Sequence, residues 1–268
     1  GKFNRVLDID YDNRTVTAQP GVTNLAITHA VQDQGFYYAP DPSSQIACSI
    51  GGNIAENSGG VHSLKYGLTT NNVLGIEFVT IDGEVIRIGG KHLDAEGYDL
   101  LGILTGSEGL LGIITEVTVR ILKSPETARA LLIGFPTIEA AGECVGSVIN
   151  AGIIPGGMEM MDRYAIEAAE AFCHAGYPLD VEALLIVELD GPEVEVDYLI
   201  AEVERMATEC GAVNVRASTS EEERMTFWAG RKAAFPAVGR LSPDYYCMDG
   251  TIPRYQLPVV LRRIAELS

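Results

Sequence analysis

Basic residues are scarce in this sequence. Its 268 residues include 19 Lys and Arg against 37 Asp and Glu, which gives a formal net charge of −18 at pH 7. Such an acidic surface repels phosphate backbones, so general nucleic-acid binding is not expected. An anionic small molecule would need a local cation to overcome the same field, and any arginine in a pocket is therefore informative.

Cysteine and histidine are few and scattered, and long apolar runs are absent. The five cysteines form no CxxC pair, which predicts small buried hydrophobes in a reducing compartment rather than disulfides. The four histidines lack the helical spacing of metal ligands, so we predict no metal site. We also expect no transmembrane helix and no secretory signal, and hence a cytoplasmic protein.

Apolar residues make up 47% of the chain, enough for one large or two smaller packed domains. Residues 1–122 have a strand-rich pattern. Apolar segments on either side of residues 11–14 predict one hairpin, and Asp82-Gly83 between two alternating segments predicts another. A helix is predicted from its cap at Thr23 to its end at Gly35, and a final strand is predicted after the glycine turn at 106–112.

Residues 123–268 alternate strands and helices, with Ser124-Pro125 as the predicted boundary. This rhythm predicts an α+β domain with a ferredoxin-like or related layer of antiparallel sheet. The predicted strands cover 128–135, 156–162, 181–191 and 212–219, and the predicted helices cover 137–152, 163–176, 193–211 and 220–235. The chain begins in a strand pattern and ends in a helix pattern, so we expect both domains to be truncated parts of longer ones.

The stretch PDPSSQIACSIGGNIAENSGG, residues 40–60, combines bare backbone with short polar side chains. Clustered backbone N–H groups can bind a pyrophosphate, and glycine allows the main chain to approach it closely. The stretch contains neither GxxxxGK[ST] nor GxGxxG, which argues against a P-loop and against a Rossmann site. Glycine content alone leaves two interpretations open, a ligand-binding loop and a plain surface loop.

Three single residues, His62, Glu108 and Arg231, have both a functional and a structural interpretation, and Trp228 has a structural one. His62 is either a ligand contact or a hydrogen-bonded loop histidine, and Glu108 is either catalytic or a carboxylate that receives turn amides. Trp228 is expected to pack in a core or at an interface. Arg231 lies three residues later on the same helical face, where it either pairs with a carboxylate or grips a substrate carboxylate bidentately.

Several motifs occur in an order that is more specific than any one of them. They are PGV, PDPSS, IGGNIAENSGG, LKYG, GSEGLLGIITE and FWAGRKAAF followed by YYCMDGTIPR. Together they resemble the FAD-linked oxidases of the vanillyl-alcohol oxidase/p-cresol methylhydroxylase type, over essentially the whole chain. Within that family they are most similar to the flavin subunits of bacterial glycolate oxidases and to D-lactate dehydrogenases.

The resemblance implies that residues 1–122 are the second subdomain of a p-cresol methylhydroxylase-type FAD-binding domain. Residues 123–268 would be the ferredoxin-like substrate domain that caps the flavin. FAD is the implied cofactor, and Arg231 falls where the family binds the substrate carboxylate, with Tyr246 in the neighbouring segment. The implied cofactor residues are Pro40, Asp41, Ser43, Ser44, Ser49, Gly51, Gly52, Asn53, Glu56, Asn57, Gly59, Gly60, Glu108, Ile113 and Ile114.

The resemblance also implies an activity, the oxidation of a small D-2-hydroxy acid, glycolate or D-lactate, to the 2-oxo acid. Electrons would pass to companion glycolate oxidase subunits that include an iron–sulfur subunit, and such partners would hold a cytoplasmic protein at the inner membrane. The family's first FAD loop and its His-rich segment, which carries metal ligands or the catalytic base, match no residue here. No catalytic residue is therefore predicted, and we expect the chain alone to be inactive. Two alternatives stay open, a related FAD-linked oxidase with another substrate and a catalytically incompetent fragment that keeps only the fold.

Overall fold

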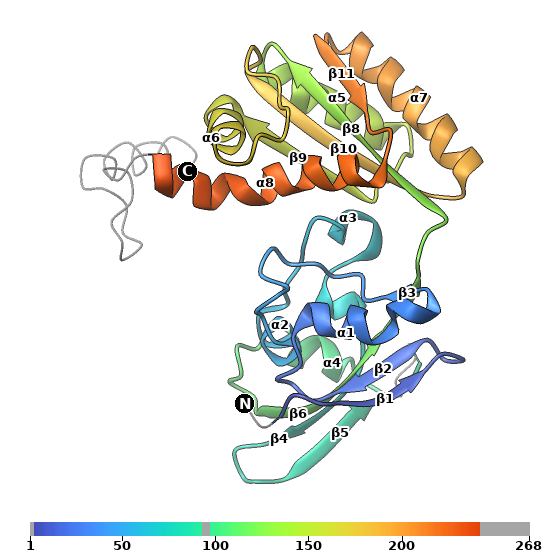
Figure 1. The fold of residues 1–268 in the computed structure, drawn as a ribbon. Coiled ribbons are helices and arrows are strands. Elements are labelled where there is room, and N and C mark those ends of the chain that lie inside the picture. The colour runs from blue at the N-terminus through green and yellow to red at the C-terminus, as the bar shows by residue number, and fades with distance from the viewer. Residues whose placement is uncertain (1–2, 93–96, 242–268) are drawn as a thin grey trace. The chain divides into compact units, whose positions relative to one another are not determined.

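The structure is a computed structural model that describes residues 3–92 and 97–241 (Figure 1). The chain divides into two compact units. The first unit comprises Gly1–Ala128, Ile154–Met158 and Glu188–Val196, and the second comprises Arg129–Ile153, Glu159–Val187 and Asp197–Ser268. The domain boundary between residues 122 and 123 stays a prediction.

The first unit is built on a five-stranded sheet in the order β1-β2-β6-β4-β5. Its strands are β1 (Val6–Asp10), β2 (Thr15–Ala18), β4 (Val73–Val79), β5 (Val85–Gly89) and β6 (Ile113–Arg120). Both predicted hairpins form, because β1 pairs antiparallel with β2 and β4 pairs antiparallel with β5. Gly83 has a φ of 81° in the second turn, a conformation that glycine adopts without strain.

Short helices and a small two-stranded pair complete the first unit. The helices are α1 (Asn24–Val31), η1 (Gln32–Gln34), α2 (Ile50–Glu56), α3 (Ser63–Tyr66), η2 (Thr69–Asn71) and α4 (Leu100–Leu104). The pair consists of β3 (Phe36–Tyr37) and β7 (Leu122–Lys123). The predicted limits of the first helix are confirmed, since Thr23 precedes α1 in extended backbone and Gly35 follows η1 in the left-handed region.

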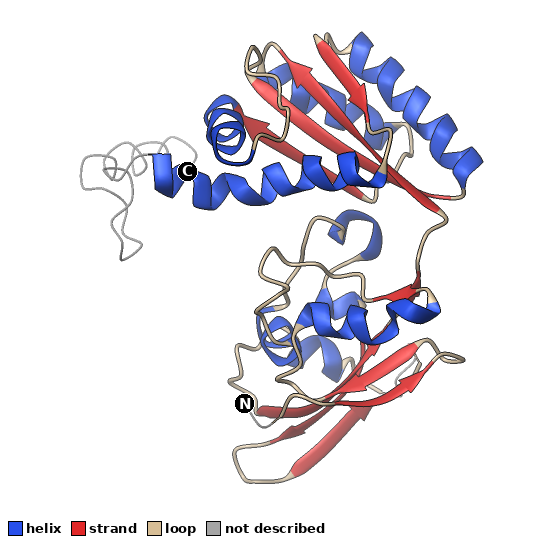
Figure 2. Cartoon of the chain, viewed as in Figure 1, coloured by secondary structure: helices blue, strands red, loops and turns tan. Residues whose placement is uncertain are grey.

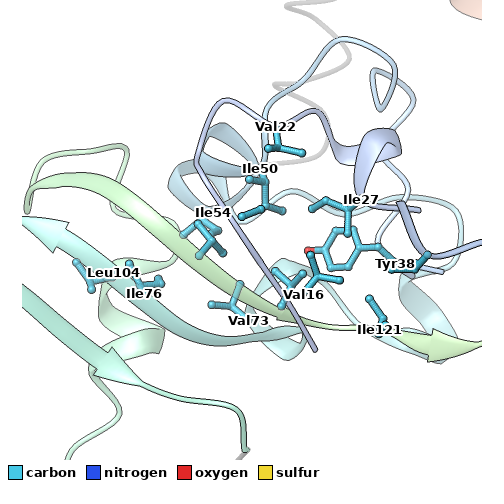
Figure 3. Close-up of a cluster of buried hydrophobic side chains, with 14 of the residues drawn as sticks. Val16, Val22, Ile27, Tyr38, Ile50, Ile54, Val73, Ile76, Leu104 and Ile121 are labelled. Atoms are coloured by element: carbon cyan, nitrogen blue, oxygen red, sulfur yellow. The ribbon is translucent and has the colours of Figure 1, made fainter. Parts of the chain in front are cut away.

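The core of the first unit lies between its sheet and helices α1 and α2 (Figure 3). Val16 and Val119 project from β2 and β6 without exposed surface, and Ile27 and Ile54 project from the two helices equally buried. Each such side chain contributes roughly 1.5–3 kcal/mol when it is fully buried. This packing fixes the position of α2, which forms the centre of the glycine-rich stretch.

The second unit is built on a four-stranded sheet in the order β11-β8-β10-β9. Its elements are β8 (Thr127–Phe135), α5 (Ile138–Asn150), β9 (Gly157–Asp162), α6 (Arg163–Cys173), β10 (Ala183–Gly191), α7 (Glu193–Glu209), β11 (Asn214–Ala217) and α8 (Glu221–Leu241). Within the sheet, β8 lies between β11 and β10, and β9 is at the edge beside β10. This is the strand order of a ferredoxin-like sheet. The predicted α+β class is therefore confirmed, with α6 inserted and α8 added.

Helices cover both faces of this second sheet (Figure 2), and the eight residues of β10 from Ala183 to Asp190 are accordingly all buried. Helix α5 begins where the sequence predicts, because Thr137 Oγ1 accepts a hydrogen bond from the Ala140 amide at 3.1 Å. Helices α6 and α8 lie side by side (Figure 1). This contact holds the helix that carries Arg231.

The cysteines do not all behave as buried hydrophobes. Cys144 is buried, but Cys48, Cys173 and Cys210 are half-buried, and Cys247 lies outside the described residues. The prediction of burial is wrong for these three, because they lie at or near helix ends rather than inside a core. Within residues 3–92 and 97–241, no helix has the length and apolar character needed to cross a membrane, and no cluster of side chains could hold a metal ion.

Candidate functional site

The glycine-rich stretch folds into a turn, a helix and a loop rather than one continuous loop. Helix α2 begins after Ser49, whose Oγ accepts a hydrogen bond from the Gly52 amide at 3.2 Å. The helix ends at Asn57, which has a left-handed φ of 53°. Because Ile50 and Ile54 bury one side of the helix in the core, the stretch has a fixed place in the first unit.

A cavity of about 470 Å³ opens in the first unit at the start of α2. Three other segments complete it: the turn before α1, the end of α4 and the chain that leads into β6. The lining residues are Pro20, Gly21, Ser49, Gly51, Gly52, Ala55, Leu104, Ser107, Gly109, Gly112, Ile113 and Ile114. None of these residues is charged, so the cavity offers backbone groups, hydroxyl groups and apolar surface.

This lining suits part of a dinucleotide, which joins a charged diphosphate to flat, largely apolar rings. Ser49 and Ser107 supply hydroxyl groups, and the glycines supply backbone that a phosphate can approach without meeting a Cβ. Ile113, 73% exposed, supplies apolar surface for a ring. Nearby on α2, Asn53 is buried, and its Nδ2 has no hydrogen-bond partner in the described part of the chain, which leaves a donor for an external acceptor.

Close packing of the chain on itself explains most glycines of the stretch. A Cβ on Gly51 would lie 2.5 Å from Pro20 Cβ, and a Cβ on Gly59 would lie 2.5 Å from Leu68 Cδ2. A Cβ on Gly60 would overlap the backbone of Asp41. Of the four glycines in the stretch only Gly51 and Gly52 line the cavity, and close approach of their backbone to a ligand stays a prediction.

Five predicted cofactor residues line the cavity, namely Ser49, Gly51, Gly52, Ile113 and Ile114. The remaining ten lie outside its lining, and their contacts with a cofactor stay predictions: Pro40, Asp41, Ser43, Ser44, Asn53, Glu56, Asn57, Gly59, Gly60 and Glu108. Among the cavity residues that the sequence interpretation misses are Pro20, Leu104 and Ser107. The PGV motif and the glycines at 106–112 are the only local signals for them. The approach of these residues to α2 depends on long-range contacts, the pairing of β2 with β6 and the packing of α4 on β4 and β5.

A charged cluster surrounds His62 in the first unit, to which the last residues of β10 also belong, Glu188 and Asp190 among them. Its Nδ1 lies 2.9 Å from Asp41 Oδ2, and its Nε2 lies 3.0 Å from Glu188 Oε1. Burial alone would lower the pKa of His62, but the hydrogen bonds to the two carboxylates outweigh burial and raise the pKa to about 10. The hydrogen-bonded interpretation of His62 is therefore confirmed. With a raised pKa, the imidazole is a cation at neutral pH that donates one hydrogen bond to each of the two carboxylates.

Asp190 binds the next turn of the same segment. Lys65 Nζ lies 2.6 Å from Asp190 Oδ1, and the Tyr66 hydroxyl donates to the other carboxylate oxygen. Burial and the hydrogen bond to Asp190 raise the pKa of Tyr66, while burial raises the pKa of Tyr37 to about 12. The LKYG motif thus anchors α3, an anchorage that the sequence does not reveal because Lys65 and Asp190 are 125 positions apart.

In the second unit, Arg231 of α8 is paired with Glu159 of β9. Arg231 Nε and Nη2 donate to the same oxygen, Glu159 Oε2, at 3.0 and 2.8 Å. Trp228, one helical turn earlier, is 4% exposed, as expected for a packed indole. The structure therefore shows Arg231 paired with a carboxylate, while its contact with a substrate stays a prediction. Tyr246 lies outside the described residues.

Comparisons with known proteins agree with the motif order. Residues 1–89 match the model of an FAD binding domain, and residues 124–268 match that of the FAD linked oxidases, C-terminal domain. A solved structure of p-cresol methylhydroxylase with substrate bound has a TM-score of 0.69 and 16% identity, covering 86% of this chain and 50% of that one. At this identity the likeness concerns the fold alone, and it confirms the expected p-cresol methylhydroxylase-type fold.

Two sequence relatives cover the whole chain or nearly so. The glycolate oxidase subunit GlcD of Escherichia coli K12 is 59% identical over 267 residues, which make up 100% of this chain and 54% of that protein. A D-lactate dehydrogenase of Archaeoglobus fulgidus is 35% identical over 265 residues, or 98% of this chain and 58% of that protein. The chain thus spans just over half the length of these relatives.

Proposed function

Because this chain belongs to the FAD-linked oxidases, we propose that the full-length protein oxidises a small D-2-hydroxy acid to the 2-oxo acid. Glycolate and D-lactate are the proposed substrates. The observation that carries the proposal is the 59% identity, along the whole chain, to a glycolate oxidase subunit. The likeness to a D-lactate dehydrogenase supports the second substrate.

FAD is the cofactor of this family, and the cavity of the first unit is the proposed site for part of it. Ser49, Ser107 and the backbone at Gly51 and Gly52 would hold the diphosphate, and Ile113 would contact a ring. When bound, FAD supplies the acceptor for the hydride that leaves the substrate. The uncharged lining leaves binding to neutral donors, which suits charge spread over several phosphate oxygens.

Arg231 is the proposed ligand of the substrate carboxylate, and Tyr246 is proposed beside it. A planar guanidinium matches a carboxylate bidentately, and the net charge of −18 makes a local cation necessary for an anionic substrate. Holding the carboxylate also orients the neighbouring C–H and hydroxyl groups for reaction, an effect of proximity. We assign no described residue as the base that takes the hydroxyl proton.

Companion subunits are the proposed electron acceptors, and one of them would carry an iron–sulfur centre. The E. coli relative is itself a subunit, which supports an assembly of several chains. We propose a cytoplasmic protein that is held at the inner membrane through these partners.

A substrate panel on the purified full-length protein tests the proposal. Turnover is measured with a dye as electron acceptor on glycolate, D-lactate, L-lactate and a 4-alkylphenol. We expect turnover of glycolate or D-lactate, less with L-lactate and none with the phenol. Turnover of the phenol alone would assign the protein to a related oxidase with another substrate. A protein that binds FAD but turns over none of the hydroxy acids would be a catalytically incompetent protein that keeps the fold.

A further inference from the structure

Helix α8 is held closely just before Arg231. The Tyr177 hydroxyl donates to the Phe227 carbonyl, and a Cβ on Gly230 would overlap the Tyr177 hydroxyl oxygen. Only glycine at position 230 lets the helix backbone lie so close to Tyr177. Packing therefore fixes the backbone that carries Arg231, and Glu159 fixes its guanidinium.

The ion pair uses only one edge of the guanidinium. Nε and one N–H of Nη2 bind Glu159 Oε2, at 3.0 and 2.8 Å. A guanidinium has five N–H donors. The two N–H groups on Nη1 and the second N–H group on Nη2 therefore remain available. These donors form the end of the fork, an edge that can bind another carboxylate bidentately. Within the described part of the chain, Glu159 is the only charged partner of Arg231.

We propose that Glu159 is a positioning residue for Arg231 and that it selects substrates with a single carboxylate. Glu159 occupies the side edge of the guanidinium and leaves the end edge for the substrate. Its negative charge then repels a second carboxylate on the substrate. The inference rests on the proposed function, because it takes Arg231 as the ligand of the substrate carboxylate.

One cation has to serve two carboxylates in this arrangement. With a monocarboxylate bound, Glu159, Arg231 and the substrate together keep one net negative charge, and a dicarboxylate would add another. Lys232 is exposed, and consecutive helix residues do not share a face, so it is not placed to compensate. Arg231 and Glu159 are 35% and 27% exposed, which weakens the repulsion by solvent screening without removing it.

The test compares variants of the full-length holoenzyme on glycolate and D-malate, which carry one and two carboxylates. Glu159→Gln keeps the shape and one acceptor but removes the charge. We expect it to raise kcat/KM for D-malate relative to glycolate about fivefold, as for a partly exposed charge pair. Glu159→Asp keeps the charge but shortens its reach to Arg231. We expect it to raise the KM for glycolate about tenfold and to leave the D-malate to glycolate ratio unchanged.

Glu182→Gln is the matched control, because Glu182 is an exposed partner of Arg163 in the same unit. It should change neither the KM nor the ratio. A second readout is independent of turnover: calorimetry of acetate and succinate binding to the same proteins. We expect Glu159→Gln to strengthen succinate binding relative to acetate by about the same factor of five.

An unchanged ratio in both readouts for a folded Glu159→Gln contradicts the inference. Should that variant not fold, as judged by circular dichroism, Glu159→Asp decides, since an unchanged glycolate KM and unchanged acetate affinity overturn the positioning role. A wild-type protein that binds acetate but oxidises neither glycolate nor D-lactate overturns the proposed function instead. In that case the binding ratio still tests the role of Glu159.

Discussion

The two candidate binding regions meet an anion on an acidic protein by different means. The cavity of the first unit has no charged residue in its lining and offers glycine backbone with two serine hydroxyls. The second unit presents one guanidinium, Arg231, that Glu159 already holds. A diphosphate spreads its charge over several oxygens and suits many neutral donors, whereas a carboxylate suits one planar fork. Under the proposed assignments, ligand geometry rather than net charge would decide which donors each region uses.

We expect the largest loss of activity at Arg231, because this single cation is the proposed ligand of the substrate carboxylate. Arg231→Lys in the full-length protein keeps a cation but loses the planar fork. We expect kcat/KM for the hydroxy acid to fall about a hundredfold, since hydrogen bonds to charged groups contribute ~1.5–3 kcal/mol. Lys232→Met removes the adjacent, exposed cation and should change little. Unchanged steady-state kinetics for Arg231→Lys would remove Arg231 from the substrate site.

A single methyl group should disturb the neutral cavity. In Gly51→Ala the new Cβ would lie 2.5 Å from Pro20 Cβ, so α2 and Pro20 must move apart, and both line the cavity. We expect FAD affinity to fall about tenfold and the free energy of unfolding to drop by ~1–3 kcal/mol from overpacking. Flavin fluorescence during titration of the full-length apoprotein measures the affinity.

Gly142→Ala is the control for this change, because a Cβ there meets open space on the helix α5. It should leave FAD affinity unchanged and the free energy of unfolding equal or slightly higher. Equal FAD affinity for Gly51→Ala and wild type would place the cofactor elsewhere than in this cavity.

The charged cluster around His62 should make the free energy of unfolding depend on pH. The pKa of His62 is raised to about 10 in the folded chain, against ~6.5 in an unfolded one. Its stabilising contribution is therefore complete below pH ~6.5 and is lost as the pH rises through about 10. After allowance for solvent screening, we expect a loss of about 1–2 kcal/mol in the free energy of unfolding.

Urea unfolding of wild type and His62→Gln between about pH 6 and pH 10 measures this loss. The variant should lack the part of the decline that belongs to His62. Parallel profiles for the two proteins would show that the cation between Asp41 and Glu188 contributes nothing to stability.

Exposed ion pairs should contribute least. Arg163 pairs with Glu167 and Glu182, but 51%, 47% and 52% of these side chains are exposed. Arg163→Gln is expected to lower the free energy of unfolding by less than ~1 kcal/mol, measured by the same urea method. A loss as large as that of Gly51→Ala would mean that surface charge, rather than packing, stabilises this fold.

Local patterns are sufficient to predict most secondary structure of this chain. The hairpins need only alternation and a turn such as Asp82-Gly83, and α5 needs only its cap at Thr137. In the first unit, helices α2, α3 and α4 are exceptions that the sequence analysis does not predict. At α2 the reason is that Gly51 and Gly52 lower its helix propensity. Burial of Ile50 and Ile54 in the core overrides that propensity, and no local pattern announces it.

Partners that are distant in sequence could not be predicted. His62 lies 126 positions from Glu188, and Arg231 lies 72 positions from Glu159, so the fold alone selects these carboxylates from the 37 acidic residues. The glycine-rich half of the cavity is visible in the sequence, whereas Leu104 enters it only because α4 packs on β4 and β5. The role of a site residue thus becomes predictable only when its long-range neighbours are known.

The visible absorbance spectrum of the anaerobic full-length protein tests the central claim most directly. We predict that FAD is bound near stoichiometrically and that its visible band bleaches on addition of glycolate or D-lactate. A protein that holds FAD and keeps this band unchanged with both acids would contradict the assignment as a D-2-hydroxy-acid oxidase.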